Sequence, residues 1–314
     1  MPIRSLHQPA GMLLVALTLA ASAFAQPTQD KTGLEINGKY TLNPFSKLSD
    51  PVAGTFEDGA KVMVSDFYAD VAWHGLKFGE KSSFIPRFSY QALGLRYDEW
   101  TPLSVDPLVY KPTQLFGVKL HLTVKHSFKN NWSFKGTISP GIVSDYRNIN
   151  SDHWKIDGFV LFSKVQDEKM TWGIGGVLDR RFGEMLVLPA VQLDYKVNAK
   201  ASFKVMAPKY AEFWHQTWAD AALGLGVWFN GEEYTRGKEV TGAEDIQPKG
   251  NTVRYSVGTI GPMCKYTLSN GWNATASLGL AFLRRYEVFN TETEVERKLD
   301  LKETVFFRMA VNVM

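Results

Sequence analysis

The chain has 314 residues, of which 45% are hydrophobic, and its 35 Lys and Arg against 32 Asp and Glu give a formal net charge of +3. This near-neutral balance gives no support for nucleic-acid binding. Cys264 is the only cysteine, so an intramolecular disulfide is excluded and the fold must depend on burial and backbone pairing.

The first 25 residues have the pattern of a secretory signal peptide. Arg4 is the only full charge before an uncharged, mostly apolar run from Gly11 to Ala25, which ends in Ala23-Phe24-Ala25. A membrane anchor is the alternative, but this run is shorter than the about 20 apolar residues that a spanning helix needs. We therefore expect residues 1–25 to be a cleaved signal peptide and residues 26–314 to form one domain.

Three alternating segments follow the signal. Apolar and polar residues alternate from Leu34 to Asn43, and further runs extend over Ala60–Lys77 and Phe84–Tyr97. A period of two places successive side chains on opposite faces of a strand. Each segment is therefore predicted to be a strand with one apolar and one polar face.

The clearest alternation comes next, on both sides of a short turn. From Phe116 to Phe128 apolar residues alternate with Gly, Lys, His, Thr and Ser, and from Trp132 to Ile142 the pattern repeats. Only Lys129-Asn130-Asn131 separates the two runs. The pair is predicted to be an antiparallel hairpin.

The remaining alternating segments continue to the end of the chain. They are 171–181, 187–196, 202–215, 221–229, 252–266, 272–282 and 305–313. We expect 202–215 to fold back near Pro208 into two short strands, and we expect a bulge within 252–266, where the two faces exchange. No long stretch has a helical period, so little or no helix is predicted after the signal.

These strands are longer than those typical of soluble proteins, and several have the about 9 to 11 residues of a transmembrane strand. Aromatic residues also flank the short turns, as Phe128 and Trp132 do, and this placement is typical of a membrane interface. The predicted fold is an all-β, antiparallel transmembrane β-barrel of about 14 strands, or of 12 if the short hairpin or the first strand is absent. A soluble exported barrel or sandwich is the alternative.

Loop lengths predict the orientation of such a barrel in the bacterial outer membrane. Short turns at 129–131, 167–169, 197–200 and 269–271 are expected to face the periplasm. Longer polar segments at 98–114, 144–153, 230–250 and 290–300 are expected outside the cell. The partners expected for this location are outer-membrane lipids and the outer-membrane assembly machinery.

The layout resembles a domain-of-unknown-function family of predicted bacterial outer-membrane β-barrel proteins. The resemblance is carried by Ile138-Ser139-Pro140-Gly141-Ile142 after a turn-Trp hairpin, by Leu188-Pro189, and by Val205-Met206-Ala207-Pro208. It implies a barrel over nearly all of the mature chain and brings no catalytic or ligand-binding residues. The chain departs from common barrel proteins at its end, where Met314 replaces the usual terminal aromatic and lies on the opposite register from Val313.

No motif for catalysis, metal binding or a cofactor is found. The histidines are scattered without metal-ligand spacing, and phosphate loops, zinc-protease motifs and serine-hydrolase elbows are absent from the sequence. His126 and Ser127 are adjacent, but neighbouring strand residues point to opposite faces. The chain is therefore predicted to be no enzyme and to need no cofactor.

The polar faces of the strands are expected to line the lumen, where basic residues outnumber acidic ones. An excess of positive charge inside a low-dielectric wall favours anions. The function predicted is a channel or transporter for small, especially anionic, solutes. The alternative is a surface structural or interaction barrel with ligand-binding outer loops and a lumen closed by paired charges. The expected lumen-lining residues are Lys119, His121, Lys125, Lys135, Asp157, Asp179, Arg181, Asp194, Arg285 and Arg308.

Overall fold

A computed structural model describes residues 33–49, 61–98, 114–147, 149–179, 186–237, 252–268, 271–289 and 295–313. The expected signal peptide at residues 1–25 lies outside the described residues. The elements are β1 (Leu34–Ser49), β2 (Lys61–Trp73), β3 (Leu76–Lys77), β4 (Ser82–Asp98), β5 (Gln114–Ser127), β6 (Trp132–Ser144), η1 (Ser151–His153), β7 (Trp154–Val165), β8 (Met170–Asp179), β9 (Leu186–Lys196), β10 (Ala201–Ala207), β11 (Tyr210–Gln216), β12 (Ala221–Thr235), β13 (Thr252–Thr267), β14 (Trp272–Phe289), β15 (Val295–Leu301) and β16 (Thr304–Val313).

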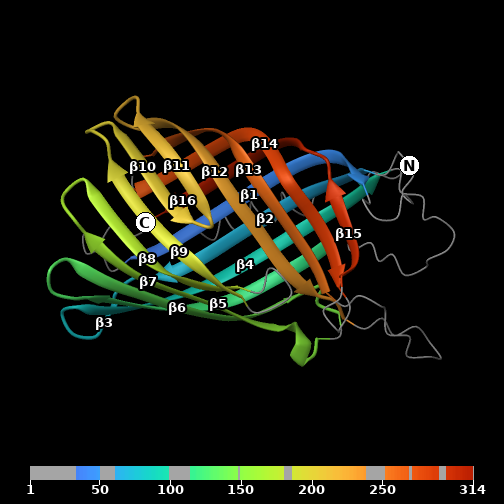
Figure 1. Cartoon of the computed structure of the whole chain (residues 1–314), viewed down its shortest axis with the longest axis horizontal. Coiled ribbons are helices and arrows are strands. Elements are labelled where there is room, and N and C mark those ends of the chain that lie inside the picture. Colours follow the sequence, from blue (N-terminus) through green and yellow to red (C-terminus); the bar gives the residue numbers. More distant parts are fainter. Residues whose placement is uncertain are drawn as a thin grey trace.

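The strands form one antiparallel sheet that closes on itself (Figure 1). β1 pairs with β2 on one side and with β16 on the other, so the first and last strands join the ring. β15 and β16 pair in succession with the same neighbours and act as one interrupted strand, which gives a closed barrel of 14 strands. The predicted all-β barrel is confirmed, and it has 14 strands, not 12.

The predicted hairpin at Pro208 is present as β10 and β11, which are seven residues each. Among the described residues, the helical content is one turn of 3-10 helix, η1. Within the same ranges, no helix is long and apolar enough to cross a membrane.

Short and long connections separate the two ends of the barrel. At the short-turn end, β5 joins β6 through 128–131, β7 joins β8 through 166–169, β9 joins β10 through 197–200 and β11 joins β12 through 217–220. The strand ends that border the longer connections, such as Asp98, Ser144 and Thr235, lie at the opposite end, which we term the long-loop end.

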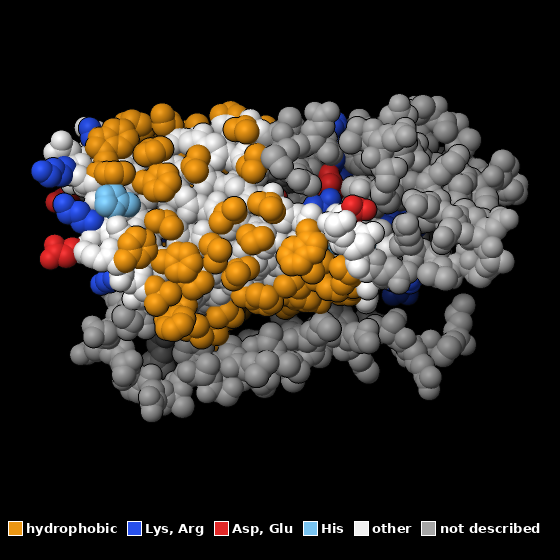
Figure 2. Space-filling view, turned by 90° about the horizontal axis from the view of Figure 1, so that it is seen from below, with side chains coloured by type: hydrophobic (Ala, Val, Ile, Leu, Met, Phe, Trp, Pro, Cys, Tyr) orange, Lys and Arg blue, Asp and Glu red, His pale blue; other side chains and the backbone are white. Residues whose placement is uncertain are grey.

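The outer surface of the wall is apolar. Residues on the outward register of successive strands are exposed hydrophobics, among them Phe88, Leu120, Ile138, Ile174 and Leu278. Figure 2 shows this surface on one side of the molecule, with charged side chains toward both ends of the apolar band. Soluble proteins rarely expose a continuous apolar area of this extent, whereas a wall in contact with lipid requires one.

Aromatic side chains gather on this outer surface near the short-turn end. Trp132 and Trp172 pack edge to face with ring centroids 5.5 Å apart, and Phe128, Tyr266 and Trp218 are exposed beside the turns. Their rings are apolar and their N–H and O–H groups can stay hydrated, as at a membrane interface.

The alternation is interrupted once in β14, with a consequence for the lumen. Leu283 has a positive φ of 46°, and the β13–β14 register shifts by one residue between Ser256 and Gly258. The extra residue lies in β14, whereas the bulge had been expected in 252–266. Because one extra residue exchanges the two faces of a strand, Arg284 is buried inside the barrel and Arg285 is exposed.

Toward the long-loop end the barrel interior is filled by an apolar cluster. Val64, Leu93, Leu115, Tyr234 and Phe306 belong to it, and each has 2% exposure or less. These side chains come from β2, β4, β5, β12 and β16, so the cluster joins opposite sides of the wall. Packing of this kind leaves no continuous aqueous path through that part of the lumen.

We predict that Phe306 and Phe307 contribute unequally to stability, because they are adjacent but lie on opposite faces. Phe306 is fully buried in the inner cluster, while Phe307 is 40% exposed on the outer surface. Phe306→Ala should lower the free energy of unfolding by about 3 to 5 kcal/mol, the usual cost for a buried Phe. Phe307→Ala, its matched control, should cost less. Urea unfolding in vesicles, followed by gel mobility, compares them; an equal loss in both variants would contradict a packed interior.

Candidate functional site

A cavity of about 710 Å³ occupies the barrel interior between the apolar cluster and the short-turn end. Its wall consists mainly of inward-facing residues from β2, β4, β5, β6 and β7, with β12 completing the ring. Six Lys or Arg residues line it against three Asp or Glu. The basic residues are Lys39, Arg87, Lys119, Lys125, Lys135 and Lys209, and the acidic ones are Asp66, Asp157 and Glu232.

The acidic side chains of the cavity are committed to other protein groups. The Lys119 Nζ lies 2.7 Å from Asp157 Oδ2 and 2.9 Å from Glu232 Oε2, and the Gln91 amide donates to Asp66 at 3.0 Å. Each of these acidic side chains thus has a partner within the protein. The positive charge that they leave unpaired lies toward the short-turn end of the cavity.

Lys125 and Lys135 carry much of this remaining charge. They lie directly opposite each other on β5 and β6, and neither forms an ion pair with a carboxylate in the part of the chain that the structure describes. Lys135 lies over the ring of Phe159 at 5.6 Å. Like charges facing across a strand pair are destabilising, so this arrangement favours an anion between or beside them.

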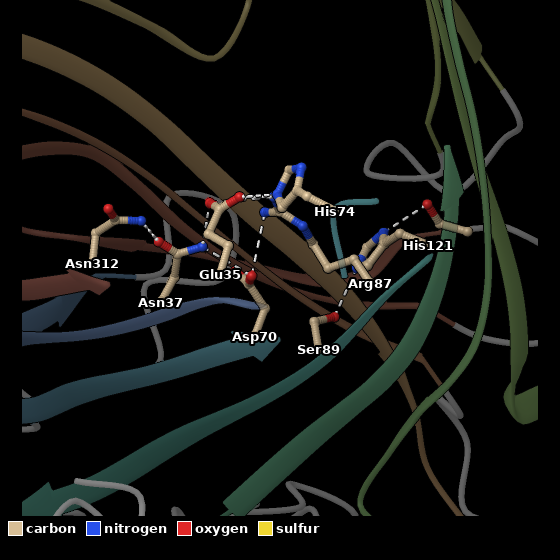
Figure 3. A network of polar contacts seen from close by, with 9 residues as sticks. Glu35, Asn37, Asp70, His74, Arg87, Ser89, His121 and Asn312 are labelled. Carbon is tan, nitrogen blue, oxygen red and sulfur yellow. Dashed lines mark hydrogen bonds and ion pairs between the residues drawn. The ribbon is translucent and has the colours of Figure 1, made fainter. Parts of the chain in front are cut away.

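A polar network reinforces the seam where the two ends of the chain meet (Figure 3). The Glu35 carboxylate lies 2.6 Å from His74 Nε2 and 3.4 Å from Arg87, whose guanidinium also lies 3.3 Å from Asp70. Asn37 donates to Glu35 and to Asp70, and it accepts from Asn312 of β16. The network therefore links β1, β2, β4 and β16.

His121 forms a second group on the cavity wall, between two serines (Figure 3). Its Nε2 lies 2.8 Å from Ser89 Oγ and its Nδ1 lies 2.7 Å from Ser139 Oγ. A serine nucleophile is normally activated by a histidine whose second nitrogen is held by a carboxylate. Here both ring nitrogens contact hydroxyls, so the group has the character of a structural polar contact. His126 likewise contacts Ser82 at 2.7 Å and not its neighbour Ser127.

The described residues hold no group of three or more His, Cys, Asp or Glu side chains placed to bind a metal. The cationic side chains that line the cavity are ammonium and guanidinium groups, which act as charges and hydrogen-bond donors.

The end of β12 closes the cavity toward the long-loop end. β11 begins at Tyr210, opposite Trp228. Beyond this point β12 remains beside β13 as far as Thr235, while its other edge meets β6, where Thr235 pairs with Ser144 in parallel (Figure 1). We term residues 230–237 the β12 tip. Its Tyr234 joins the apolar cluster.

Ion pairs and hydrogen bonds hold the β12 tip in place. Glu233 lies 3.0 Å from Lys155 of β7 and 3.1 Å from Arg254 of β13, and all three side chains are buried. The Gly237 N–H donates to Asp145 Oδ1 at 2.9 Å. A Cβ on Gly237 would lie 1.6 Å from the carbonyl oxygen of Arg147, so only glycine allows this close approach.

The structure places the ten expected lumen residues in five groups. Lys119, His121, Lys125, Lys135 and Asp157 line the main cavity, and Arg308 lines a small neighbouring cavity. Asp194 accepts from Gln192 on the inward face of β9, away from the main cavity. Arg181 and the side chain of Asp179 lie outside the described residues. Arg285 does not share the inward face, because the extra residue at Leu283 gives that place to Arg284.

Sequence reasoning missed Glu232, Glu233 and Lys209. The two glutamates lie in a segment expected to be an outer loop, although β12 extends to Thr235. Residues 230–235 read Asn-Gly-Glu-Glu-Tyr-Thr, which has no apolar–polar alternation, so the sequence gives no signal that the strand continues. Lys209 follows Pro208 in the β10–β11 turn, and nothing in the sequence shows that this turn borders the lumen.

The sequence matches the family described as "Domain of unknown function (DUF6268)" over residues 90–312. The chain belongs to this family. The resemblance found in the sequence is thus confirmed, and the barrel is the fold of this DUF6268 member. No curated protein matches the chain.

Among solved structures, this DUF6268 member is similar to outer-membrane barrels. An outer membrane channel from Pseudomonas putida F1 has 12% identity and a TM-score of 0.44, covering 92% of this chain and 99% of that one. A Pseudomonas aeruginosa FadL homologue has 9% identity and a TM-score of 0.44, covering 89% of each chain. LpxR from Salmonella typhimurium has 9% identity and a TM-score of 0.35, covering 89% of this chain and 99% of that one.

We predict that Glu233→Gln loosens the β12 tip. The variant leaves Lys155 and part of Arg254 uncompensated in a buried place, at a cost of about 3 kcal/mol. This is the low end for a broken buried pair, because Gln keeps an acceptor and Arg254 also contacts Glu287 at 3.0 Å. Amide hydrogen exchange at residues 230–235 should accelerate. Asp220→Asn, in an exposed turn at the other end, is the control. Unchanged exchange in the Glu233 variant would show that the ion pairs do not hold the tip.

Proposed function

We propose that this chain is an outer-membrane barrel whose basic cavity binds small anionic solutes and passes them across the membrane when the β12 tip moves. The short-turn end faces the periplasm in this proposal, as the loop lengths suggest. The observation that carries it is the pair Lys125 and Lys135, which face each other across neighbouring strands with no carboxylate partner in the described part of the chain. Such a pair offers an anion favourable charge in a lumen of low dielectric constant.

Location is the first point to test. We expect the mature chain to sediment with outer membranes, to require the outer-membrane assembly machinery for insertion, and to migrate faster on gels before heating than after. The closed sheet and its apolar outer surface are the reasons, because a barrel satisfies all its backbone groups inside lipid. Recovery of the chain in the soluble periplasmic fraction without detergent would refute the proposal.

Anion preference is tested by conductance in planar bilayers. In a KCl gradient, the reversal potential of the open channel should indicate preference for chloride, and Lys125→Gln with Lys135→Gln should move it toward the cation side. Removal of two like charges should leave stability unchanged or raise it by up to about 1 kcal/mol. Lys169→Gln, in an exposed turn outside the lumen, is the control for charge alone.

The Glu233→Gln variant shows how an absence of conductance in that experiment is to be interpreted. If the β12 tip restricts passage, this variant should open more often than the wild-type chain. Silent bilayers with both proteins would contradict conduction. An unchanged reversal potential in the double lysine variant would contradict selection by these lysines.

The alternative function is a surface interaction barrel with a closed lumen and ligand-binding outer loops. The apolar cluster favours it, because side chains such as Leu115 and Phe306 fill the long-loop half of the barrel. Replacement of 238–250 by a short Gly-Ser linker distinguishes the two functions. On the alternative, binding at the cell surface is lost while the barrel still inserts; on the proposed function, anion conductance persists.

A further inference from the structure

The wall of the barrel has a gap above the β10–β11 turn. β10 pairs with β9 only over 191–196, and the last β11–β12 pair is Tyr210 with Trp228. The Phe229 N–H still donates to the carbonyl oxygen of Lys209 at 2.8 Å. Beyond this turn, among the described residues, Leu186–Ala190 of β9 and the following part of β12 have no strand partner on the sides that face each other.

The main cavity reaches this gap. Around most of the ring, the strand residues that line the cavity lie on the inward register. The lining residues on the outward register are Gly158, Leu178, Ala207, Phe229 and Gly231. All five belong to β7, β8, β10 and β12, the strands around the gap. A cavity bordered there by residues of both faces communicates with the outer surface of the wall.

The chemistry changes from this gap to the interior. Leu178, Ala207 and Phe229 are apolar, and the two glycines add no side chain that would fill the opening. Farther inside, Phe159 and Trp228 provide aromatic surface. The basic groups come next, with Lys135 over the Phe159 ring and Lys125 opposite it on β5. The surface that a ligand meets is therefore apolar at the wall and cationic in the lumen.

We infer that the cavity takes an amphipathic anion, an alkyl carboxylate, which enters from the lipid-facing side of the barrel through this gap. The carboxylate would lie at Lys125 and Lys135 and the alkyl chain along Phe159 toward Leu178 and Phe229. A volume of about 710 Å³ lies within the range of ligand pockets in proteins. The inference rests on the proposed function, since the same lysines bind the anion, and it adds the ligand class and the route.

Ligand class is tested with the purified full chain in an uncharged detergent. The probe is 11-(dansylamino)undecanoate, and its fluorescence is followed as decanoate, decanamide or acetate displaces it. Decanoate should displace it at least tenfold more effectively than decanamide, which lacks the charge, and than acetate, which lacks the chain. Lys135→Gln should weaken probe binding about tenfold, equivalent to about 1.4 kcal/mol, while Lys169→Gln leaves it unchanged.

The outcomes separate this inference from the proposed function. Equal displacement by acetate and decanoate would refute the amphipathic ligand and leave a cavity for hydrophilic anions. Equal displacement by decanamide would refute recognition of the charge, and absence of probe binding to the wild-type chain would refute the ligand class. Anion-selective conductance from the same preparation would still support the proposed function.

The route is tested by quenching from the lipid phase. In a Cys264→Ser background, bimane is attached to Cys introduced at Val177, which is inward-facing, 7% exposed and lines the cavity beside Leu178. Thr123→Cys, inward-facing and 8% exposed away from the gap, is the matched control, and the outward Ile174→Cys gives full lipid contact. Brominated lipids should quench bimane at 177 nearly as strongly as at 174 and far more than at 123. Equal quenching at 177 and 123 would refute entry through the wall.

Discussion

Closure of the sheet is the constraint from which the rest of this structure follows. A strand inside lipid needs partners on both edges, because an unpaired backbone group there costs several kcal/mol, and the edges of β9 and β12 at the gap depart from this pairing. The chain meets this requirement by pairing β1 with β16 over Ile36 to Leu42. Once the ring is closed, the period of two divides every strand into a lipid-facing and a lumen-facing half. The seam is also where inward polar contacts are dense, through Asn37, Asn312 and Asp70.

The contact of β12 with β6 determines the shape of the interior. β10 and β11 are too short to follow β12 along its whole length, so the edge of β12 beyond them meets β6 while its other edge stays paired with β13. This arrangement places Tyr234 in the apolar cluster and Glu233 against Lys155. The lumen therefore has a packed half and a hollow half, and the wall is incomplete beside the hollow half. One pair of short strands thus accounts for the closed end, the cavity and the gap.

The strands could be predicted from the sequence because the lipid and the lumen impose the alternation directly. Runs such as Phe116 to Phe128 record which face each residue meets, and the number of strands required between successive short turns predicts that the chain folds back near Pro208. The local sequence pattern could not show where the register of a strand shifts by one residue. Arg284 and Arg285 are equivalent in the sequence, and only the extra residue at Leu283 decides which of them enters the barrel.

Interactions across the lumen were beyond prediction for a related reason. The contact of Lys119 with Glu232 joins residues of β5 and β12 that are 113 positions apart, and no strand pairing predicts it. It exists because β12 extends beyond β11 and reaches β6, which depends on the length of β10 and β11. The part of the cavity wall from Lys119 to Asp157 lies on β5, β6 and β7 and was predictable from local pattern. The part from Trp228 to Glu232 depends on the path of β12.

The energies at the β12 tip indicate how often such a barrel could open. Burial of a side chain such as Tyr234 contributes about 1.5 to 3 kcal/mol. Three hydrogen bonds, from Gly237 to Asp145, from Thr235 to Asp152 and from Asp145 to Thr235, add about 0.5 to 1.5 kcal/mol each. The ion pairs of Glu233 add little, because opening returns both partners to water and removes their desolvation cost.

These contacts sum to about 3 to 7.5 kcal/mol, so a tip that separates from β6 while it keeps its pairing with β13 would be open in fewer than one molecule in about a hundred. The ion pairs then have a different role from the apolar contacts. Glu233 contributes little to the free energy of closing, yet it defines where the closed tip lies, since any other buried position leaves Lys155 without this partner. A closed state maintained by apolar packing and positioned by charge would shift toward the open state when a solute binds the open form preferentially.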